Sequence, residues 1–125
     1  MKTTFLKCFL IAAFAFFILV APRTSAALDL IVEHSPIDAS HFTDIQAAID
    51  YARAQLAGSP ASNTTFRIVV KADPSPYYGT FTPISNVPIV GSETARTYLD
   101  QFGSGPLISI NNATNITIKN FTIYS

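Results

Sequence analysis

Short strand-like runs fill the second half of this chain and restrict its fold more than any other feature. Each run holds a few apolar and β-branched residues and is bounded by Pro, Gly, Asn, Asp or Ser, which favour turns. No Asn-Gly or Asp-Gly pair, the usual signal of a tight hairpin, joins any two runs. The pattern therefore favours a parallel solenoid, and an antiparallel sandwich or barrel is the alternative. The runs occupy residues 66–70, 79–84, 87–91, 97–99, 106–110, 115–118 and 121–125.

Isoleucines recur among these runs at an interval typical of a solenoid. Ile68, Ile89 and Ile108 are 21 and 19 residues apart. In a parallel solenoid each coil places an inward apolar residue above the equivalent residue of the previous coil, so we expect these three to stack. The corners between such strands suit Asn, which tolerates the left-handed backbone region. The residues expected at corners are Asn111, Asn112, Asn115 and Asn120.

One amphipathic helix is expected before these runs, after a short strand within residues 28–35. Thr43 and Gln46 have the spacing of a capping box at the start of the helix. Gly58 and Pro60 are expected to end it. The apolar residues fall on one face at helical spacing, while charged and polar residues occupy the other faces. The predicted apolar face consists of Ile45, Ala48, Ile49, Ala52 and Leu56.

Residues 1–26 have the features of a signal peptide. Two lysines accompany a fourteen-residue apolar run at 8–21, which is shorter than the roughly 20 residues needed to span a bilayer. Thr24 and Ala26 are the small residues of a cleavage site, so we expect cleavage before Ala27. The mature protein is then secreted, periplasmic or at the cell surface, with no stable membrane span. An uncleaved N-terminal membrane anchor is the alternative.

The composition of the chain after this cleavage limits its partners. Residues 27–125 carry five Lys and Arg against eight Asp and Glu, a net charge of −3. Because no basic stripe is present, nucleic acid is not an expected partner. The sole cysteine, Cys8, lies in the signal segment, so we expect the exported part to fold without a disulfide. We divide that part into a strand and capping helix at 27–62 and solenoid coils at 63–125.

Four stretches resemble a known superfamily: FTDIQAAIDYA, FRIVVKAD, YYGTFTPISNVPIVG and ISINNATNITIKNFTI. Over residues 28–125 the chain resembles the opening of right-handed parallel β-helix proteins of the pectin lyase-like superfamily. The resemblance implies a mainly β fold that starts a right-handed parallel β-helix, with an N-terminal amphipathic helix capping the first coil. It also implies a role related to polysaccharide. The superfamily includes lyases, polygalacturonases, esterases, tailspikes and adhesins, so the fold does not decide the activity.

No catalytic pattern accompanies this resemblance. Gly79, Thr80 and Phe81 stand where pectin methylesterases have a G-x-Y turn, but the Gln and Asp motifs of that family have no match in the chain. His34 and His41 form too small a set for an expected metal site, and no cofactor is predicted. The carboxylates are expected to be solvated, with Asp73 and Asp100 in turns and Asp29 and Glu33 flanking a strand.

Two kinds of surface residue are candidate sites. Tyr77 and Tyr78 are expected to form an exposed aromatic pair on which a sugar ring could stack; packing against the helix or a loop is the competing interpretation. Four sequons match the N-glycosylation pattern, and three of them fall at expected corners, where Asn and Thr have a structural use as well. The sequons begin at Asn63, Asn112, Asn115 and Asn120.

The strand-like pattern also predicts an incomplete structure. A solenoid coil needs a neighbour on each side, and the runs here amount to one or two coils with an open edge after Phe121 and Ile123. We expect either a C-terminal continuation of the solenoid or a partner that donates a strand. The favoured function is an exported module without its own catalytic site. The alternatives are a fragment of a polysaccharide lyase or pectin esterase-type enzyme, and a non-catalytic adhesin or surface repeat protein.

Overall fold

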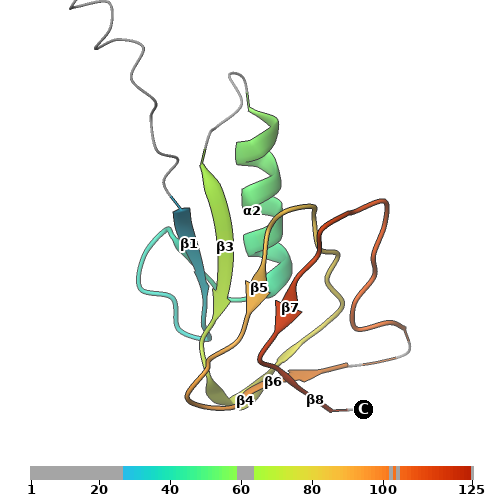
Figure 1. The fold of residues 1–125 in the computed structure, drawn as a ribbon. Coiled ribbons are helices and arrows are strands. Elements are labelled where there is room, and N and C mark those ends of the chain that lie inside the picture. Colours follow the sequence, from blue (N-terminus) through green and yellow to red (C-terminus); the bar gives the residue numbers. More distant parts are fainter. Residues whose placement is uncertain (1–26, 59–63, 102, 104, 125) are drawn as a thin grey trace, which may run out of the picture.

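Parallel strands and a single helix make up the part of the chain that the computed structural model describes, residues 27–58, 64–101, 103 and 105–124 (Figure 1). The predicted signal segment at 1–26, Pro60 and the sequon at Asn63 lie outside these residues. No helix within them is long and apolar enough to cross a membrane. The elements are β1 (Ala27–Val32), β2 (His41–Phe42), α2 (Ile45–Ala57), β3 (Thr65–Val70), β4 (Asp73–Tyr78), β5 (Ile89–Val90), β6 (Thr97–Asp100), β7 (Ile118–Lys119) and β8 (Thr122–Tyr124).

The strands form two sheets. The larger has the order β2-β1-β3-β5-β7, and the smaller has the order β4-β6-β8. Every pairing between these described strands is parallel. The prediction of a mainly β fold is therefore confirmed, and the antiparallel sandwich or barrel is wrong for this part of the chain.

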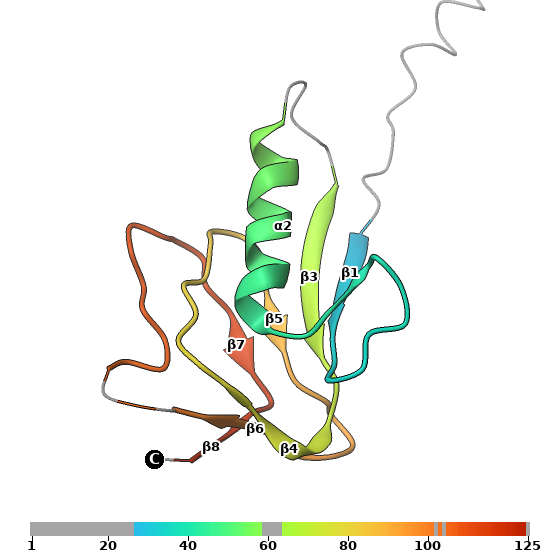
Figure 2. The same ribbon diagram turned by 180° about the vertical axis from the view of Figure 1, so that it is seen from behind.

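The chain passes repeatedly from one sheet to the other. From β3 onward successive strands alternate between the larger and the smaller sheet, so each strand pairs with the strand two places later. Figure 2 shows β3, β5 and β7 side by side behind α2, with β4, β6 and β8 in a second layer at one end of them. We call one strand of the larger sheet together with the following strand of the smaller sheet a pass, so that β3 and β4 form the first pass and β7 and β8 the last. This path brings residues of successive passes into register.

The inward ladder of the larger sheet joins Leu30, Ile68, Ile89 and Ile118. The first three side chains are at most 1% exposed. The predicted stack of Ile108 on Ile89 is wrong, because Ile108 instead forms an isolated parallel bridge with Phe81. The reason is the long connection between β6 and β7, which lengthens the repeat. Asn86 and Asn115, the corner residues before β5 and β7, are 29 residues apart. The predicted strands at 79–84 and 106–110 reduce to this one bridge.

The helix begins one residue later than the predicted capping box. Asp44 is the N-cap, and its side chain accepts a hydrogen bond from Ala47 N at 2.7 Å. The predicted pairing of Gln46 with Thr43 is wrong, because Gln46 Oε1 accepts from Thr82 N at 2.8 Å and so ties the helix to a later loop. Gly58 ends the helix as predicted.

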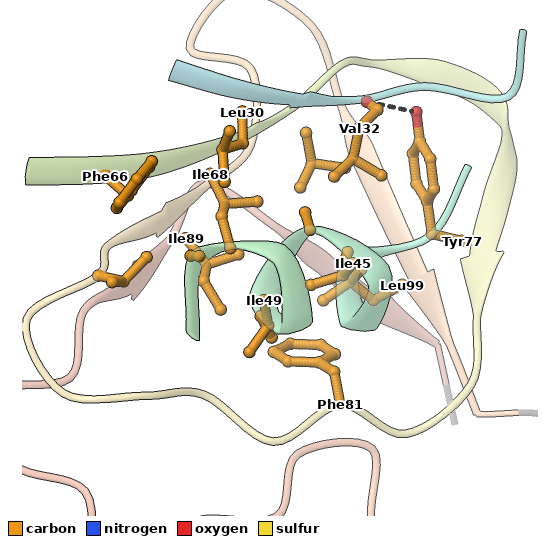
Figure 3. Packing of buried hydrophobic residues seen from close by; sticks show 14 residues of the cluster. Leu30, Val32, Ile45, Ile49, Phe66, Ile68, Tyr77, Phe81, Ile89 and Leu99 are labelled. Atoms are coloured by element: carbon orange, nitrogen blue, oxygen red, sulfur yellow. Dashed lines mark hydrogen bonds between the residues drawn. The ribbon is translucent and has the colours of Figure 1, made fainter. Parts of the chain in front are cut away.

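The core lies between α2 and the larger sheet (Figure 3). Ile45, Ala48, Ile49 and Ala52 of the helix are buried and Leu56 is partly buried, which confirms the predicted apolar face. Each large aliphatic side chain removed from water contributes about 1.5–3 kcal/mol to the free energy of folding. The helix therefore covers the apolar face of the first strands.

Two strands are absent from the sequence prediction, the two-residue β2 and the longer β4. Residues 73–78, DPSPYY, form β4, although two prolines suggest a turn. Proline cannot donate a backbone hydrogen bond, and β4 is an edge strand whose register shifts between Asp73 and Tyr77. Asp73 and Asp100 consequently lie at the ends of strands β4 and β6, and the expectation that they lie in turns is wrong.

Candidate functional site

The two tyrosines singled out by the sequence point in opposite directions from β4. Tyr77 is 4% exposed and Tyr78 is 56% exposed. Adjacent side chains of a strand lie on opposite faces, so one tyrosine enters the core when the other faces solvent. The expected exposed pair is therefore wrong for Tyr77, while sugar binding by Tyr78 stays a prediction.

Tyr77 holds together three segments of the chain. Its hydroxyl donates to Lys71 O at 2.8 Å and lies 3.4 Å from Val32 O, the contact marked in Figure 3. Its ring stacks on the His34 imidazole, with the centroids 4.3 Å apart and the planes 8° from parallel. Burial, and next the Asp73 carboxylate, raise the pKa of Tyr77 to about 12. The phenol is therefore a neutral donor at physiological pH.

A cluster of charged groups lies at the ends of β1, β2 and β3. Glu33 accepts from Lys71 Nζ at 2.9 Å and from His41 Nδ1, and His41 Nε2 lies 3.8 Å from Asp38 Oδ2. The Glu33 side chain is 15% exposed and that of His41 is 12% exposed. The Lys71 ammonium, and then the His41 ring, lower the pKa of Glu33. Glu33 is thus an ionised bridge between strands.

The sequence did not predict this cluster, because its members come from separate parts of the chain. Glu33 and His41 are 8 residues apart and become neighbours only when β2 pairs with β1. His34 turns away from His41: its Nε2 lies 3.1 Å from Ser75 O and 3.9 Å from Asp73 Oδ1. No group of three or more His, Cys, Asp or Glu in the described residues converges in a way that could hold a metal ion. Asp29, the remaining carboxylate considered, pairs with Arg67 at 2.7 Å.

A cavity of about 200 Å³ lies beside the tyrosines, between the start of α2 and the turn after β4. Two of its polar side chains, Gln46 and Thr80, already make hydrogen bonds to other parts of the chain. Gln46 binds Thr82 N, and Thr80 Oγ1 donates to Pro106 O at 2.6 Å. The side chains that line the cavity are Asp44, Ile45, Gln46, Tyr77, Tyr78, Thr80, Phe81 and Leu99.

Asparagines occupy the corners between strands. Asn86, Asn112, Asn115 and Asn120 have φ values of 65°, 50°, 54° and 65°, in the left-handed region. Three of the four predicted corner residues are therefore confirmed; Asn111 does not adopt this conformation, and Asn86 takes it without having been predicted. Asn115 Nδ2 donates to Asn86 Oδ1 at 2.8 Å, across two successive passes of the chain. The three described sequon asparagines are exposed, and their glycosylation stays a prediction.

Comparison with protein-family models, with curated proteins and with solved structures finds no match to this chain. Its function is therefore inferred from its own residues. Two features are available for that inference: polar side chains that join successive passes of the chain, and tyrosine side chains on the outside of the smaller sheet.

Proposed function

We propose that this chain is the exported N-terminal module of a right-handed parallel β-helix protein of the pectin lyase-like superfamily, with a role related to polysaccharide outside the cytoplasm. One observation carries the proposal. From β3 onward successive strands alternate between two parallel sheets, and α2 covers the apolar face of the first strands. A solenoid with a helical cap has this path, whereas a hairpin fold would pair neighbouring strands.

Side-chain ladders between passes support the same proposal. Ile68, Ile89 and Ile118 are in register on the larger sheet, and Asn86 and Asn115 bond to each other at the corner. Stacking of like residues at equivalent positions is what a solenoid uses in place of a single central core. The hydrogen bond from Thr114 N to Ser85 Oγ, at 3.0 Å, adds a further bond between the same two corners.

The module acts without its own catalytic site in this proposal. Glu33 and His41 are the described acid and base with the least exposed side chains among the ion pairs, and both are committed to bonds between strands. Tyr77 is likewise committed to the carbonyl of Lys71. A general acid or base must reach a substrate proton, and these groups face one another instead.

The proposal includes a further layer over the last strands. Ile110 and Ile123 are each 57% exposed, and the edges of β7 and β8 that face away from β5 and β6 have no strand partner among the described residues. Exposed strand edges with apolar side chains favour pairing with another strand. Either a following coil or a strand donated by a partner would cover them.

Engineered cysteines test the architecture. The double variant N86C/N115C should form a disulfide under mild oxidation, because parallel neighbours lie about 4.8 Å apart, within the Cα range of about 4.4–6.8 Å that a disulfide allows. The matched control N86C/N112C should not, since Asn112 has no such bond to Asn86. Equal oxidation of both pairs would contradict the proposed stacking.

Export is tested separately in the producing cell. The full chain should appear outside the cytoplasm with Ala27 as its first residue, as determined by N-terminal sequencing. A protein that retains residues 1–26 would support the membrane-anchor alternative, and a cytoplasmic protein would contradict the proposal.

A further inference from the structure

Three tyrosines come together on the outer face of the smaller sheet. In the parallel register Tyr78 of β4 is paired with Asp100 of β6, and Asp100 is paired with Tyr124 of β8. Tyr98 lies two residues before Asp100 on the same strand. We call these four residues the tyrosine face. The strands that carry them lie side by side in Figure 2.

The burial pattern of β6 shows which way this face points. Thr97 is 0% exposed and Leu99 is 1% exposed, so both point into the core. Side chains alternate along a strand, and Tyr98 and Asp100 therefore point outward. In-register residues of a parallel sheet share a face, which places Tyr78 and Tyr124 outward as well. They are 56% and 50% exposed.

The tyrosines lie in a row across the strands and not in a cage. Tyr98 and Tyr124 are stacked, with ring centroids 5.2 Å apart and an interplanar angle of 25°. Tyr78 and Tyr124 lie two strands apart, which corresponds to about 10 Å along the sheet. A cage that encloses a cationic methyl group needs rings on several sides. An extended row of rings instead suits a flat, elongated ligand with apolar ring faces.

Asp100 supplies the polar contact between the rings. It lies in register between Tyr78 and Tyr124, and its side chain makes no hydrogen bond or ion pair with the rest of the described chain. An ionised carboxylate accepts hydrogen bonds strongly from hydroxyl groups. Aromatic rings combined with a few placed polar groups are the usual lining of sites for small organic ligands. A sugar ring presents both complements, a C–H face and a rim of hydroxyls.

The charges around the tyrosine face disfavour an acidic ligand. Asp100 lies within the face, Asp73 lies near it on β4, and Arg96 lies beside Tyr98 and Asp73. Like charges repel a polyanion that would place its carboxylates against Asp100.

We therefore propose that the tyrosine face binds a neutral polysaccharide, with sugar rings stacked on Tyr78 and Tyr124 and hydroxyls donating to Asp100. This rests on the polysaccharide role proposed above but not on the solenoid.

Calorimetric titration of the full chain tests the inference. The neutral probes are cellohexaose and xylohexaose, and the acidic probe is hexagalacturonate. We expect a neutral probe to bind and hexagalacturonate to bind at least tenfold more weakly. Tyr78→Ala and Tyr124→Ala should each weaken binding of the neutral probe by roughly tenfold, because each removes one aromatic contact. Tyr124→Phe keeps the ring and should stay within about twofold of the wild type.

The matched control is Tyr51→Ala. Tyr51 is 39% exposed, but it lies on α2 and contacts Phe42 and Phe66, away from the smaller sheet. This variant should bind the neutral probe as the wild type does. A second measurement needs no substitution: saturation transfer from the bound sugar should reach the ring protons of Tyr78 and Tyr124 and not those of Tyr51.

Three results would overturn the inference: no binding of either neutral probe, preference for hexagalacturonate, or neutral binding that survives both alanine substitutions. Preference for hexagalacturonate, or neutral binding that survives both substitutions, would leave the polysaccharide role intact and contradict only the assignment of the tyrosine face as the neutral binding site. Failure of the N86C/N115C pair to oxidise would instead contradict the solenoid and leave this inference standing. If an alanine variant fails to fold, the saturation-transfer measurement on the wild type decides.

Discussion

The first and last passes of the chain have similar strand chemistry but differ sharply in burial. Among the described residues, the fifteen buried hydrophobic ones all lie between Leu30 and Leu99. Between residues 100 and 124 no described residue is buried. Ile68 and Ile118 occupy the same ladder, yet Ile68 is 0% exposed and Ile118 is only partly buried.

The difference shows that position along the stack decides how much a strand contributes to stability. Ile68 has β1 on one side and β5 on the other, and α2 contacts its strand. Ile118 has β5 on one side, and no described strand or helix covers the other. Because the hydrophobic effect depends on the apolar area removed from water, identical side chains stabilise these two passes unequally.

The largest expected effect comes from replacing each of the two isoleucines by alanine. Ile68→Ala should lower the free energy of unfolding by about 3 kcal/mol, as for other fully buried positions that are left with a cavity. Ile118→Ala should lower it by about 1 kcal/mol or less, because its site is already open to solvent. Urea denaturation of the two variants measures both values. Equal losses would contradict the contrast between the passes.

The next effect concerns Gly91, where β5 contacts the last pass. A Cβ at Gly91 would lie 2.2 Å from Asn120 O and 3.0 Å from Thr97 Cβ. Gly91→Ala must therefore push the last pass away from β5, at an expected loss of about 2 kcal/mol. Hydrogen exchange should accelerate at the amides of Ile89 and Gly91, which bond to that pass. The amides of β1 and β3 serve as the internal control, and acceleration there too would mean that the two regions unfold together.

Alkaline pH should affect the first pass through Tyr77. Its folded pKa, about 12, lies above the unfolded value of about 10. The folded state then holds its proton more tightly, so stability is complete below pH 10 and falls as the pH rises toward 12. Tyr77→Phe loses the bond to Lys71 O, about 1 kcal/mol at pH 7, and this deficit should shrink above pH 10. A deficit that is constant between pH 8 and pH 11.5 in denaturant titrations would contradict the assignment.

The smallest effect isolates the corner ladder of the last pass. Asn115→Ala removes the 2.8 Å bond to Asn86, while Asn112→Ala removes none that the structure records. Both residues have positive φ, so the backbone strain introduced by alanine is matched. The free energies of unfolding should differ by about 0.5–1 kcal/mol, with Asn115→Ala the less stable. No difference would mean that the ladder adds nothing to the stacking of the strands.

Local patterns in the sequence predicted the elements with continuous periodicity. The helical stripe from Ile45 to Leu56 identified both the helix and its buried face, because five matches at helical spacing are read from neighbouring residues alone. The helix start was off by one residue, since Thr43 and Asp44 are both good caps and the choice depends on what Gln46 contacts. That contact, Thr82 N, lies 36 residues away.

The sequence pattern missed the register between strands and the side of the sheet on which individual side chains lie. Ile108 and Ile118 both look like the residue that follows Ile89, and the length of the connection after β6 decides between them. Tyr77 and Tyr78 look alike in sequence, and the register shift in β4 helps set which one enters the core. The tyrosine face needed three strands in register before it could be seen.

Composition and periodicity alone predicted short strands, one amphipathic helix and asparagine corners, because each of these features arises from the conformational preferences of a few adjacent residues, and they favoured parallel pairing without deciding it. The stacking partners, the buried hydroxyl of Tyr77, the Glu33 bridge and the outward row of tyrosines were decided by the tertiary structure. Each of them joins residues from different passes, and a pairing across passes depends on loop lengths and on register, to which no local preference is sensitive.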